Sequence, residues 1–311
     1  MNQVPFVTLD NGTRMPQLGF GLWRVPDTGA QAAVATALEA GYRSIDTAAV
    51  YANERGAGRA ISASGVPRGE LFVTTKLWND RDETWSRDNV LRAFDASLDR
   101  LGLDHVDLYL IHWPRPMHEE YPAIWRTFEE IAGSGRAKVV GVSNFGPAQL
   151  ARLHAESPLV PAVNQVELHP YFRQRELREA HAAHGIATEA WAPPGQGKDL
   201  LAEPAVLAVA GRHGRSAAQV VLRWHLQQGV IAIPKSVTPA RIRENLDVFG
   251  FELDASDLAA LGGLDSGRRL GPAPETSDPP RLGGRPSRWR RIARRMSGLV
   301  SPSRGRGPGG G

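Results

Sequence analysis

The sequence predicts a (β/α)8 TIM barrel with an N-terminal β-hairpin cap. Short β-branched or apolar runs alternate with longer helical patterns eight times within roughly 250 residues, the size of a single barrel domain. The chain is 41% hydrophobic, enough to fill a sizeable core. The main alternative is a doubly wound sheet with a dinucleotide site, which requires G-x-G-x-x-G after its first strand. Residues 19–24 read GFGLWR and lack the third glycine, so the barrel is favoured.

The elements follow one another in a regular order. Val7–Met15 reads as a hairpin around Asp10-Asn11-Gly12, placed to cap the bottom of the barrel. Eight strands are expected at Leu18–Gly21, Ser44–Asp46, Phe72–Lys76, Val106–His112, Val139–Ser143, Val163–Glu167, Ala187–Trp191 and Val230–Pro234. Helical patterns span 31–40, 53–64, 87–101, 122–134, 147–155, 174–184, 216–228 and 239–248, with Gly41 and Gly185 as C-terminal stop signals.

Composition changes near the C-terminus. Residues 279–311 hold nine of the chain's 37 basic residues, all Arg, and no acidic residue, so the rest of the chain has 28 basic against 33 acidic residues. We therefore predict a barrel over residues 1–278 and a basic, disordered tail over 279–311. A tail without a partner is the favoured interpretation, and binding to an anionic membrane or nucleic acid is the alternative. No such partner is expected for the barrel.

Several function classes are disfavoured by composition. The chain has no Cys, which excludes disulfides and thiolate metal sites. The N-terminus lacks the basic and apolar regions of a signal peptide, and no apolar run approaches the ~18 residues of a membrane span. A cytoplasmic protein is expected.

Polar residues stand where several predicted strands end, which is where barrels of this type place function. Asp46, Lys76 and His112 end the second, third and fourth strands, and Tyr51 follows Asp46 in a loop that could return to the same mouth. Buried charges are costly unless paired. A nearby ammonium lowers a tyrosine pKa, and Asp46 would keep Lys76 charged. With His112 orienting a carbonyl oxygen, the cluster suits proton donation by Tyr51 as a hydride arrives.

Six ordered segments resemble the aldo-keto reductase family, most closely the bacterial branch with 2,5-diketo-gluconate reductases. They are GYRSIDTAAVY (41–51), TTKLW (74–78), DLYLIHWP (107–114), GVSNF (141–145), NQVELHPY (164–171) and IPKSV (233–237). The resemblance covers about residues 5–277. It implies a metal-free, usually monomeric, NADPH-dependent oxidoreductase that reduces carbonyls.

Carried over by position, the resemblance makes Tyr51 the general acid and Lys76 and Asp46 its tuners, with His112 orienting the substrate. It implies cofactor contacts at Ser143, Asn144 and Gln165 (carboxamide), Trp191 (stacking), Lys235, Ser236 and Arg241 (2′-phosphate), and Glu244 and Asn245 (adenine). Lys and Arg together suit a dianionic phosphate, which favours NADPH over NADH. We also expect Gly21 at the cofactor site.

Other tryptophan and histidine residues are expected to line the substrate pocket or to have structural roles. Trp23, Trp78 and Trp113 are expected to wall an apolar substrate pocket. His169 is interpreted as structural, without an obvious chemical partner. His181, with His184 three residues on, is interpreted as part of a solvated helix face rather than a metal site, and no metal is expected.

The segment after Trp191 departs from the family pattern. The family usually has Ser-Pro-Leu there, whereas this chain has Ala192-Pro193-Pro194. Pro194 offers no N–H to a pyrophosphate, and Ala192 removes a hydroxyl. Lys198 stands near where some members carry an acidic residue. The cofactor is therefore expected to bind less tightly than usual, or Lys198 to contact the pyrophosphate.

The leading hypothesis is an enzyme that reduces aldehydes or ketones such as keto-sugars or 2-oxoaldehydes. The alternative is a cofactor-sensing binding protein on the same scaffold, with the tail binding nucleic acid or membrane. All four catalytic positions are filled, which favours the enzyme.

Overall fold

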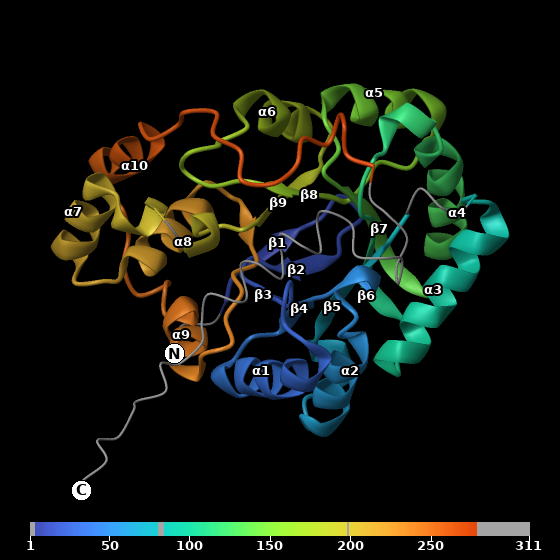
Figure 1. Cartoon of the computed structure of the whole chain (residues 1–311), viewed down its shortest axis with the longest axis horizontal. Coiled ribbons are helices and arrows are strands. Elements are labelled where there is room, and N and C mark those ends of the chain that lie inside the picture. Colours follow the sequence, from blue (N-terminus) through green and yellow to red (C-terminus); the bar gives the residue numbers. More distant parts are fainter. Residues whose placement is uncertain (1–3, 80–83, 198, 279–311) are drawn as a thin grey trace, which may run out of the picture.

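Eight parallel strands form the centre of the molecule, and helices surround them (Figure 1). The computed structural model describes residues 4–79, 84–197 and 199–278. The strands are β1 (Phe6–Thr8), β2 (Arg14–Pro16), β3 (Phe20–Gly21), β4 (Ser44–Asp46), β5 (Phe72–Leu77), β6 (Val106–Ile111), β7 (Ala137–Ser143), β8 (Val163–Glu167), β9 (Ala187–Trp191) and β10 (Ile231–Ala232). The helices are α1 (Asp27–Ala40), α2 (Glu54–Ala63), α3 (Arg87–Leu101), α4 (Tyr121–Gly133), α5 (Pro147–Glu156), α6 (Arg175–Ala183), α7 (Pro204–His213), α8 (Ala217–Gln227), α9 (Pro239–Leu246) and α10 (Ala255–Gly262).

The large sheet closes on itself. Its order runs β10-β9-β8-β7-β6-β5-β4-β3, and every neighbouring pair is parallel. A parallel bridge between Leu18 and Ala232 joins the two ends, supported by the Gly19 N–H donating to the Ala232 carbonyl at 2.9 Å. The predicted barrel is confirmed, and the carboxyl ends of all eight strands face the same mouth.

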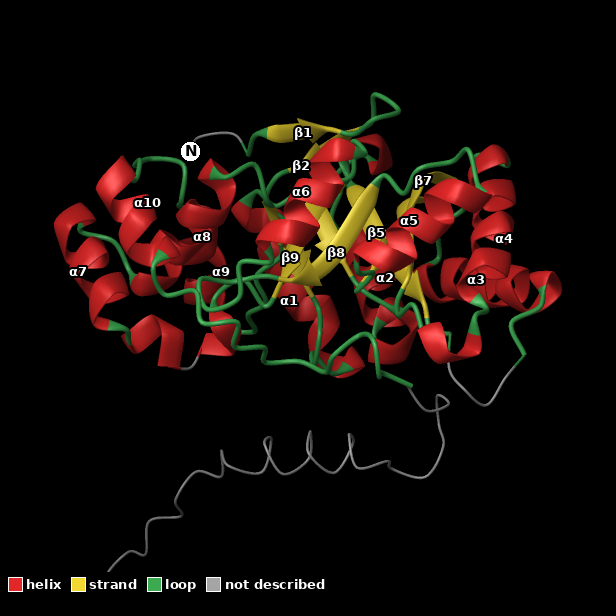
Figure 2. Ribbon diagram, turned by 90° about the horizontal axis from the view of Figure 1, so that it is seen from above, coloured by secondary structure: helices red, strands yellow, loops and turns green. Residues whose placement is uncertain are grey.

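The N-terminal hairpin pairs β1 with β2 and lies at one end of the barrel (Figure 2). Leu9 in its turn and Met15 in β2 are buried in a cluster with interior barrel residues such as Phe72 and Val139. Phe72 and Val139 lie near the amino ends of their strands. The hairpin therefore caps the bottom of the barrel, as predicted, and leaves the opposite mouth for the site.

Local signals account for the helix boundaries. α1 begins at Asp27, four residues before its predicted start, and stops at Gly41, whose φ of 114° is the left-handed conformation that favours glycine. α3 has the predicted bounds, with the Ser86 hydroxyl accepting the Asn89 N–H at its start. Two helices, α7 and α10, were not predicted. α10 nonetheless carries a capping box between Asp254 and Asp257.

The predicted tail, residues 279–311, lies outside the described residues, so the division of the chain at residue 278 stays a prediction. Among the helices that the structure describes, none combines the length and apolar character needed to cross a membrane.

Candidate active site

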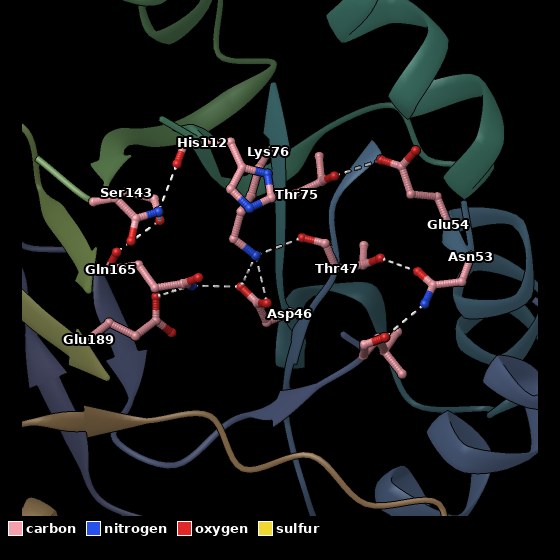
Figure 3. A network of polar contacts seen from close by, with 12 residues as sticks. Asp46, Thr47, Asn53, Glu54, Thr75, Lys76, His112, Ser143, Gln165 and Glu189 are labelled. Atoms are coloured by element: carbon pink, nitrogen blue, oxygen red, sulfur yellow. Dashed lines mark hydrogen bonds and ion pairs between the residues drawn. The ribbon is translucent and has the colours of Figure 1, made fainter. Parts of the chain in front are cut away.

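The centre of the mouth is a buried ion pair between the ends of β4 and β5 (Figure 3). The Lys76 ammonium donates to both carboxylate oxygens of Asp46, at 2.6 and 2.8 Å, and to the Thr47 carbonyl at 2.9 Å. Lys76 is 0% exposed, so its ammonium depends on these protein acceptors in place of water. Burial alone would lower the pKa of Lys76, but the charges of Asp46 and Tyr51 outweigh it and the pKa is raised. The ammonium is therefore charged and fixed in direction.

Tyr51 returns to this ion pair from the loop after β4. A short 3-10 helix, Ala49–Tyr51, carries it, and the Thr47 hydroxyl donates to the Asn53 side chain at 2.6 Å across the loop. The Tyr51 ring centroid lies 5.2 Å from the Lys76 ammonium. The structure therefore brings the predicted proton donor beside its predicted tuner.

The pKa of Tyr51 differs from the sequence expectation. Burial raises the pKa of Tyr51 to about 12, although the Lys76 charge acts to lower it, because desolvation of the phenolate outweighs the ammonium. The hydroxyl is thus protonated throughout the neutral range. It is available as a donor, with Lys76 stabilising the negative charge left behind.

His112 follows β6 and faces Tyr51 edge-on, with the ring centroids 5.8 Å apart and the planes at 79°. Burial, and then the nearby Lys76 charge, hold the pKa of His112 well below its ordinary value. The ring is therefore a neutral imidazole, which has one N–H donor and one acceptor nitrogen. It can donate a hydrogen bond to a carbonyl oxygen without competing with Tyr51 as an acid.

Two of the three predicted wall residues contact His112. The Trp78 ring lies edge-on at 5.2 Å, and the Trp113 ring lies parallel at 6.5 Å. Trp23 is 40% exposed and stacks under the Arg24 guanidinium, 4.0 Å away. Trp78 and Trp113 therefore border the catalytic imidazole with apolar surface, whereas Trp23 has no described ring contact with it.

The residues expected around the nicotinamide lie directly beside the catalytic cluster. The Trp191 indole N–H donates to the Asn144 side-chain carbonyl at 2.9 Å. The Asn144 amide donates to the His112 carbonyl at 3.0 Å and to the Ser143 hydroxyl at 3.1 Å. Gln165 donates to Asp46 at 2.8 Å. The Ser143 hydroxyl donates to the Gln165 carbonyl at 2.8 Å, so one hydrogen-bonded chain joins the ends of β4, β6, β7, β8 and β9.

Glu189, a residue that the sequence interpretation missed, extends this chain. It is fully buried on β9, and its carboxylate accepts a second hydrogen bond from the Gln165 amide at 2.8 Å. Burial, and then the charge of Asp46, raise the pKa of Glu189 to about 8. A signal existed: Glu189 stands two residues before Trp191, so a strand places both side chains on the same face.

A second group of predicted residues lies after β10 and along α9. Lys235 and Arg241 are exposed, Ser236 is buried, and its hydroxyl accepts the Thr238 N–H at 3.1 Å just before α9. No ion pair of Lys235 or Arg241 is found among the described residues. The Lys235 side chain is exposed as a whole, but partial desolvation of its ammonium, and then the nearby Arg24 charge, lower its pKa. Two cations beside a helix N-terminus match the chemistry of a dianionic phosphate.

The remaining members of the predicted cofactor set lie near this group. Glu244 and Asn245 lie in the last turns of α9. Gly21 ends β3, and its N–H donates to the Pro234 carbonyl at 3.0 Å. A Cβ at Gly21 would lie 3.0 Å from the Ile233 carbonyl oxygen, so a side chain would push the strand ends apart. The described residues therefore fit a dinucleotide that runs from Trp191 to α9.

The segment after Trp191 has an unusual backbone. Ala192 has a φ of 52°, in the left-handed region, and the Pro193 carbonyl lies 3.2 Å from the His225 ring nitrogen. Burial lowers the pKa of His225 to about 3, so this ring is neutral. Lys198 lies outside the described residues. The expected weakening of cofactor binding by Ala192 and Pro194 stays a prediction.

The interpretation of His181 as solvated was wrong. His169, interpreted as structural, does have a partner, because its Nε2 lies 2.9 Å from the buried Glu167 carboxylate. His181 is 1% exposed rather than solvated, since α6 packs it against the barrel, where it contacts Asn164 at 2.9 Å and Thr188 at 2.8 Å. Burial lowers the pKa of His181 to about 4. Both residues tie strand ends to neighbouring segments.

Known proteins resemble this chain in sequence and structure over most of its length. The model of the "Aldo/keto reductase family" matches residues 15–266. An aldo-keto reductase of Mycolicibacterium smegmatis is 52% identical over 272 residues, covering 88% of this chain and 98% of that one. Methylglyoxal reductase DkgA of Yersinia pestis is 48% identical over 276 residues, covering 88% and 98%. The solved structure of a Gox0644 mutant in complex with NADPH superposes with a TM-score of 0.83 at 44% identity, covering 89% and 99%.

Proposed function

We propose, since the chain belongs to the aldo/keto reductase family, that it reduces small aldehydes and ketones to alcohols with NADPH and that Tyr51 donates the proton. The observation that carries the proposal is the Asp46–Lys76 ion pair beside Tyr51 and His112. A family relative is solved with NADPH, which supports the choice of cofactor.

Each of the four residues has a distinct role in the proposed reaction. NADPH, when bound, supplies the hydride. His112, neutral and bordered by Trp78 and Trp113, donates a hydrogen bond that orients the substrate carbonyl oxygen. Tyr51 gives its proton to the same oxygen, and Lys76 stabilises the resulting phenolate. Asp46 keeps Lys76 charged and aimed at the phenol ring.

Cofactor binding is proposed to use both groups of predicted residues. Trp191 would stack on the nicotinamide, with Ser143, Asn144 and Gln165 around its carboxamide. Lys235, Ser236 and Arg241 would hold the 2′-phosphate, with Glu244 and Asn245 near the adenine and Gly21 allowing close approach. The two cations and the N-terminus of α9 support NADPH over NADH.

The substrate class is proposed from the pocket walls and a relative. Trp78 and Trp113 present apolar surface beside His112, so the carbonyl carbon would sit against aromatic rings. DkgA of Yersinia pestis, 48% identical, is a methylglyoxal reductase. Small 2-oxoaldehydes and keto-sugars are therefore the proposed substrates. The cytoplasmic, monomeric state expected from the sequence stays a prediction.

The proposed function is tested by NADPH oxidation with a panel of carbonyl compounds. Replacing Tyr51 with Phe removes the proton donor and keeps the ring, so kcat is expected to fall by about 10²–10⁴-fold. NADPH affinity, measured by quenching of tryptophan fluorescence, is expected to change little. A Tyr51→Phe enzyme with most of its activity would contradict the role of Tyr51. A protein that binds NADPH but reduces no carbonyl would favour a cofactor-sensing function.

A further inference from the structure

The buried carboxyl of Glu189 lies under the nicotinamide side of the site and touches none of the four proposed catalytic residues directly. Its Oε2 accepts from the Gln165 amide at 2.8 Å. Its Oε1 is buried and has no hydrogen-bond partner among the described residues. Figure 3 shows Gln165 between Glu189 and Asp46. The hydrogen-bonded link described between Glu189 and the catalytic cluster is therefore the Gln165 amide.

The Gln165 amide has only one orientation that satisfies its neighbours. A Gln side chain has two N–H donors on nitrogen and one carbonyl acceptor. Nε2 donates to Asp46 Oδ2 and to Glu189 Oε2, each at 2.8 Å, so both of its hydrogens are used. The reversed amide would direct its oxygen at the Asp46 carboxylate, which has no proton to donate while it is paired with Lys76. The carbonyl Oε1 is left as the polar group available to a ligand in the mouth.

We propose that Glu189 is a positioning residue for carbonyl reduction: together with Asp46 it fixes the Gln165 amide so that its carbonyl accepts an N–H of the nicotinamide carboxamide. The inference rests on the proposed function, because it assumes that NADPH binds at Trp191. The role of Glu189 is then to accept one hydrogen bond from the Gln165 amide, which is more specific than filling space in the core.

The charge state of Glu189 supports this arrangement. Titratable groups that act on it are Asp46 on β4 and Lys76 on β5, and it acts in turn on Tyr51. The neighbouring strand β10, Ile231–Ala232, has no titratable residue. An ionised oxygen without a donor is costly when buried. Burial and Asp46 raise the pKa of Glu189 to about 8, so it is neutral at neutral pH and still offers Oε2 as an acceptor.

Ionisation of Glu189 is expected to lower kcat. Burial is the largest cause of the raised pKa of Tyr51, and the negative charge of Glu189 is a further one, so ionisation of Glu189 makes the phenol a weaker acid. The kcat of the wild-type enzyme is therefore expected to decline as the pH rises through about 8, before Tyr51 or Lys76 titrates.

Two variants of Glu189 separate these effects in the full-length protein. Glu189→Met removes the acceptor and nearly keeps the volume, so NADPH is expected to bind about fivefold to tenfold more weakly, the size of one hydrogen bond. Adenosine 2′,5′-bisphosphate, which lacks the nicotinamide, is expected to bind with wild-type affinity. Glu189→Gln keeps an acceptor without a charge, so it is expected to restore NADPH affinity relative to Glu189→Met and to abolish the decline of kcat above pH ~8.

The outcomes that would overturn the proposal are distinct from those that would overturn the function. Equal weakening of NADPH and the bisphosphate in Glu189→Met would indicate a merely structural role. Glu189→Gln keeps the acceptor for the Gln165 amide. A Glu189→Gln enzyme that binds NADPH as weakly as expected for Glu189→Met, with the bisphosphate bound normally, would also contradict the proposal, and this readout remains if Glu189→Met does not fold. Wild-type protein that binds NADPH without reducing any carbonyl would refute the proposed function, whereas the binding comparison would still test Glu189.

Discussion

At the scale of single residues, the site depends on a lysine that is completely removed from water. Lys76 is 0% exposed, and its ammonium donates to the Asp46 carboxylate and to the Thr47 carbonyl. A buried ion pair of this kind is weak evidence for stability, but removing one partner is costly because the other charge remains buried. The same contacts that fix the catalytic ammonium therefore make the fold sensitive to its loss.

Replacing Lys76 with Met is expected to lower the free energy of unfolding by about 3–5 kcal/mol, because the Asp46 carboxyl would be left buried without its cation. The double variant with Asp46→Asn removes both charges and should recover much of this loss. Urea unfolding of the wild type, both single variants and the double variant measures the coupling. A Lys76→Met protein as stable as the wild type would show that the pair contributes little.

Glu189 gives the stability a pH dependence of known sign. Its pKa is raised from 4.5 to about 8 on folding, so the folded state binds a proton that the unfolded state releases between these values. Stability contributed by this group is complete below pH ~4.5 and is lost as the pH rises towards 8. Glu189→Gln should therefore show a smaller fall in Tm between pH 5 and pH 8 than the wild type. The exposed Glu252→Gln, measured in parallel, should match the wild type.

The positions of the catalytic residues could be predicted from the sequence, whereas their pKa values could not. Asp46, Lys76 and His112 were found because strand ends with charged residues are conspicuous in sequence. The upward pKa shift of Tyr51 was not foreseen, because it depends on how much water the folded loop excludes. Glu189 was missed for a related reason. Its importance comes from a hydrogen bond across strands that are neighbours only in the folded barrel.

At the scale of elements, close packing of neighbouring helices requires a glycine. Gly58 in α2 faces the end of α3, where an added Cβ would lie 2.0 Å from the Leu101 carbonyl oxygen. Backbone atoms cannot move aside as a flexible side chain can. By contrast, Gly211 in α7 has no heavy atom within 4 Å of an added Cβ. The two positions therefore respond to the same substitution in opposite ways.

Gly58→Ala is expected to destabilise the protein by about 1–3 kcal/mol through overpacking of α2 against α3. Gly211→Ala should stabilise it by about 0.5–1 kcal/mol, because alanine restricts the unfolded chain and favours the helix. Urea unfolding followed by circular dichroism compares the two. Equal effects in the two variants would mean that the α2–α3 contact tolerates a shift of the helices.

Element order was predictable, whereas the elements outside the repeat were not. Eight strand-and-helix units were identified because each has a clear hydrophobic period. α7 and α10 were not assigned, although Pro204 begins α7 and Asp254 with Asp257 caps α10. Both helices lie outside the simple alternation from which the barrel was derived. Their start signals are local, and such signals do not by themselves place a helix in the barrel.

At the scale of the whole molecule, the C-terminal segment, residues 266–278, joins opposite parts of the mouth. Its Leu270 N–H donates to the buried Glu167 carboxylate, as does the Gly271 N–H at 2.9 Å. An added Cβ at Gly271 would lie 2.5 Å from the Trp191 ring. At the far end, Asp278 contacts Arg115 at 3.2 Å. The segment thus packs behind the proposed nicotinamide-stacking ring and ends beside the loop after β6.

Two truncated chains test how far the functional unit extends. A chain ending at residue 278 keeps every contact that the structure describes for the C-terminal segment, so its kcat and KM for NADPH are expected to equal those of the full-length protein. The full-length protein is likewise expected to show no binding to nucleic acid or anionic vesicles that the truncated chain lacks. Salt-sensitive binding that disappears on truncation would instead make the basic tail a binding module.

A chain ending at residue 265 is expected to differ sharply. It removes both backbone donors from the buried Glu167 carboxylate, leaving His169 as its described partner, at a cost of about 1–3 kcal/mol for each unmet hydrogen bond. It also removes Gly271 from the Trp191 ring. A lower Tm and weaker NADPH binding should therefore appear together. Unchanged NADPH affinity at a lowered Tm would separate the two effects and show that Trp191 keeps its position without Gly271, for which the 2.9 Å bond from its indole N–H to Asn144 would account.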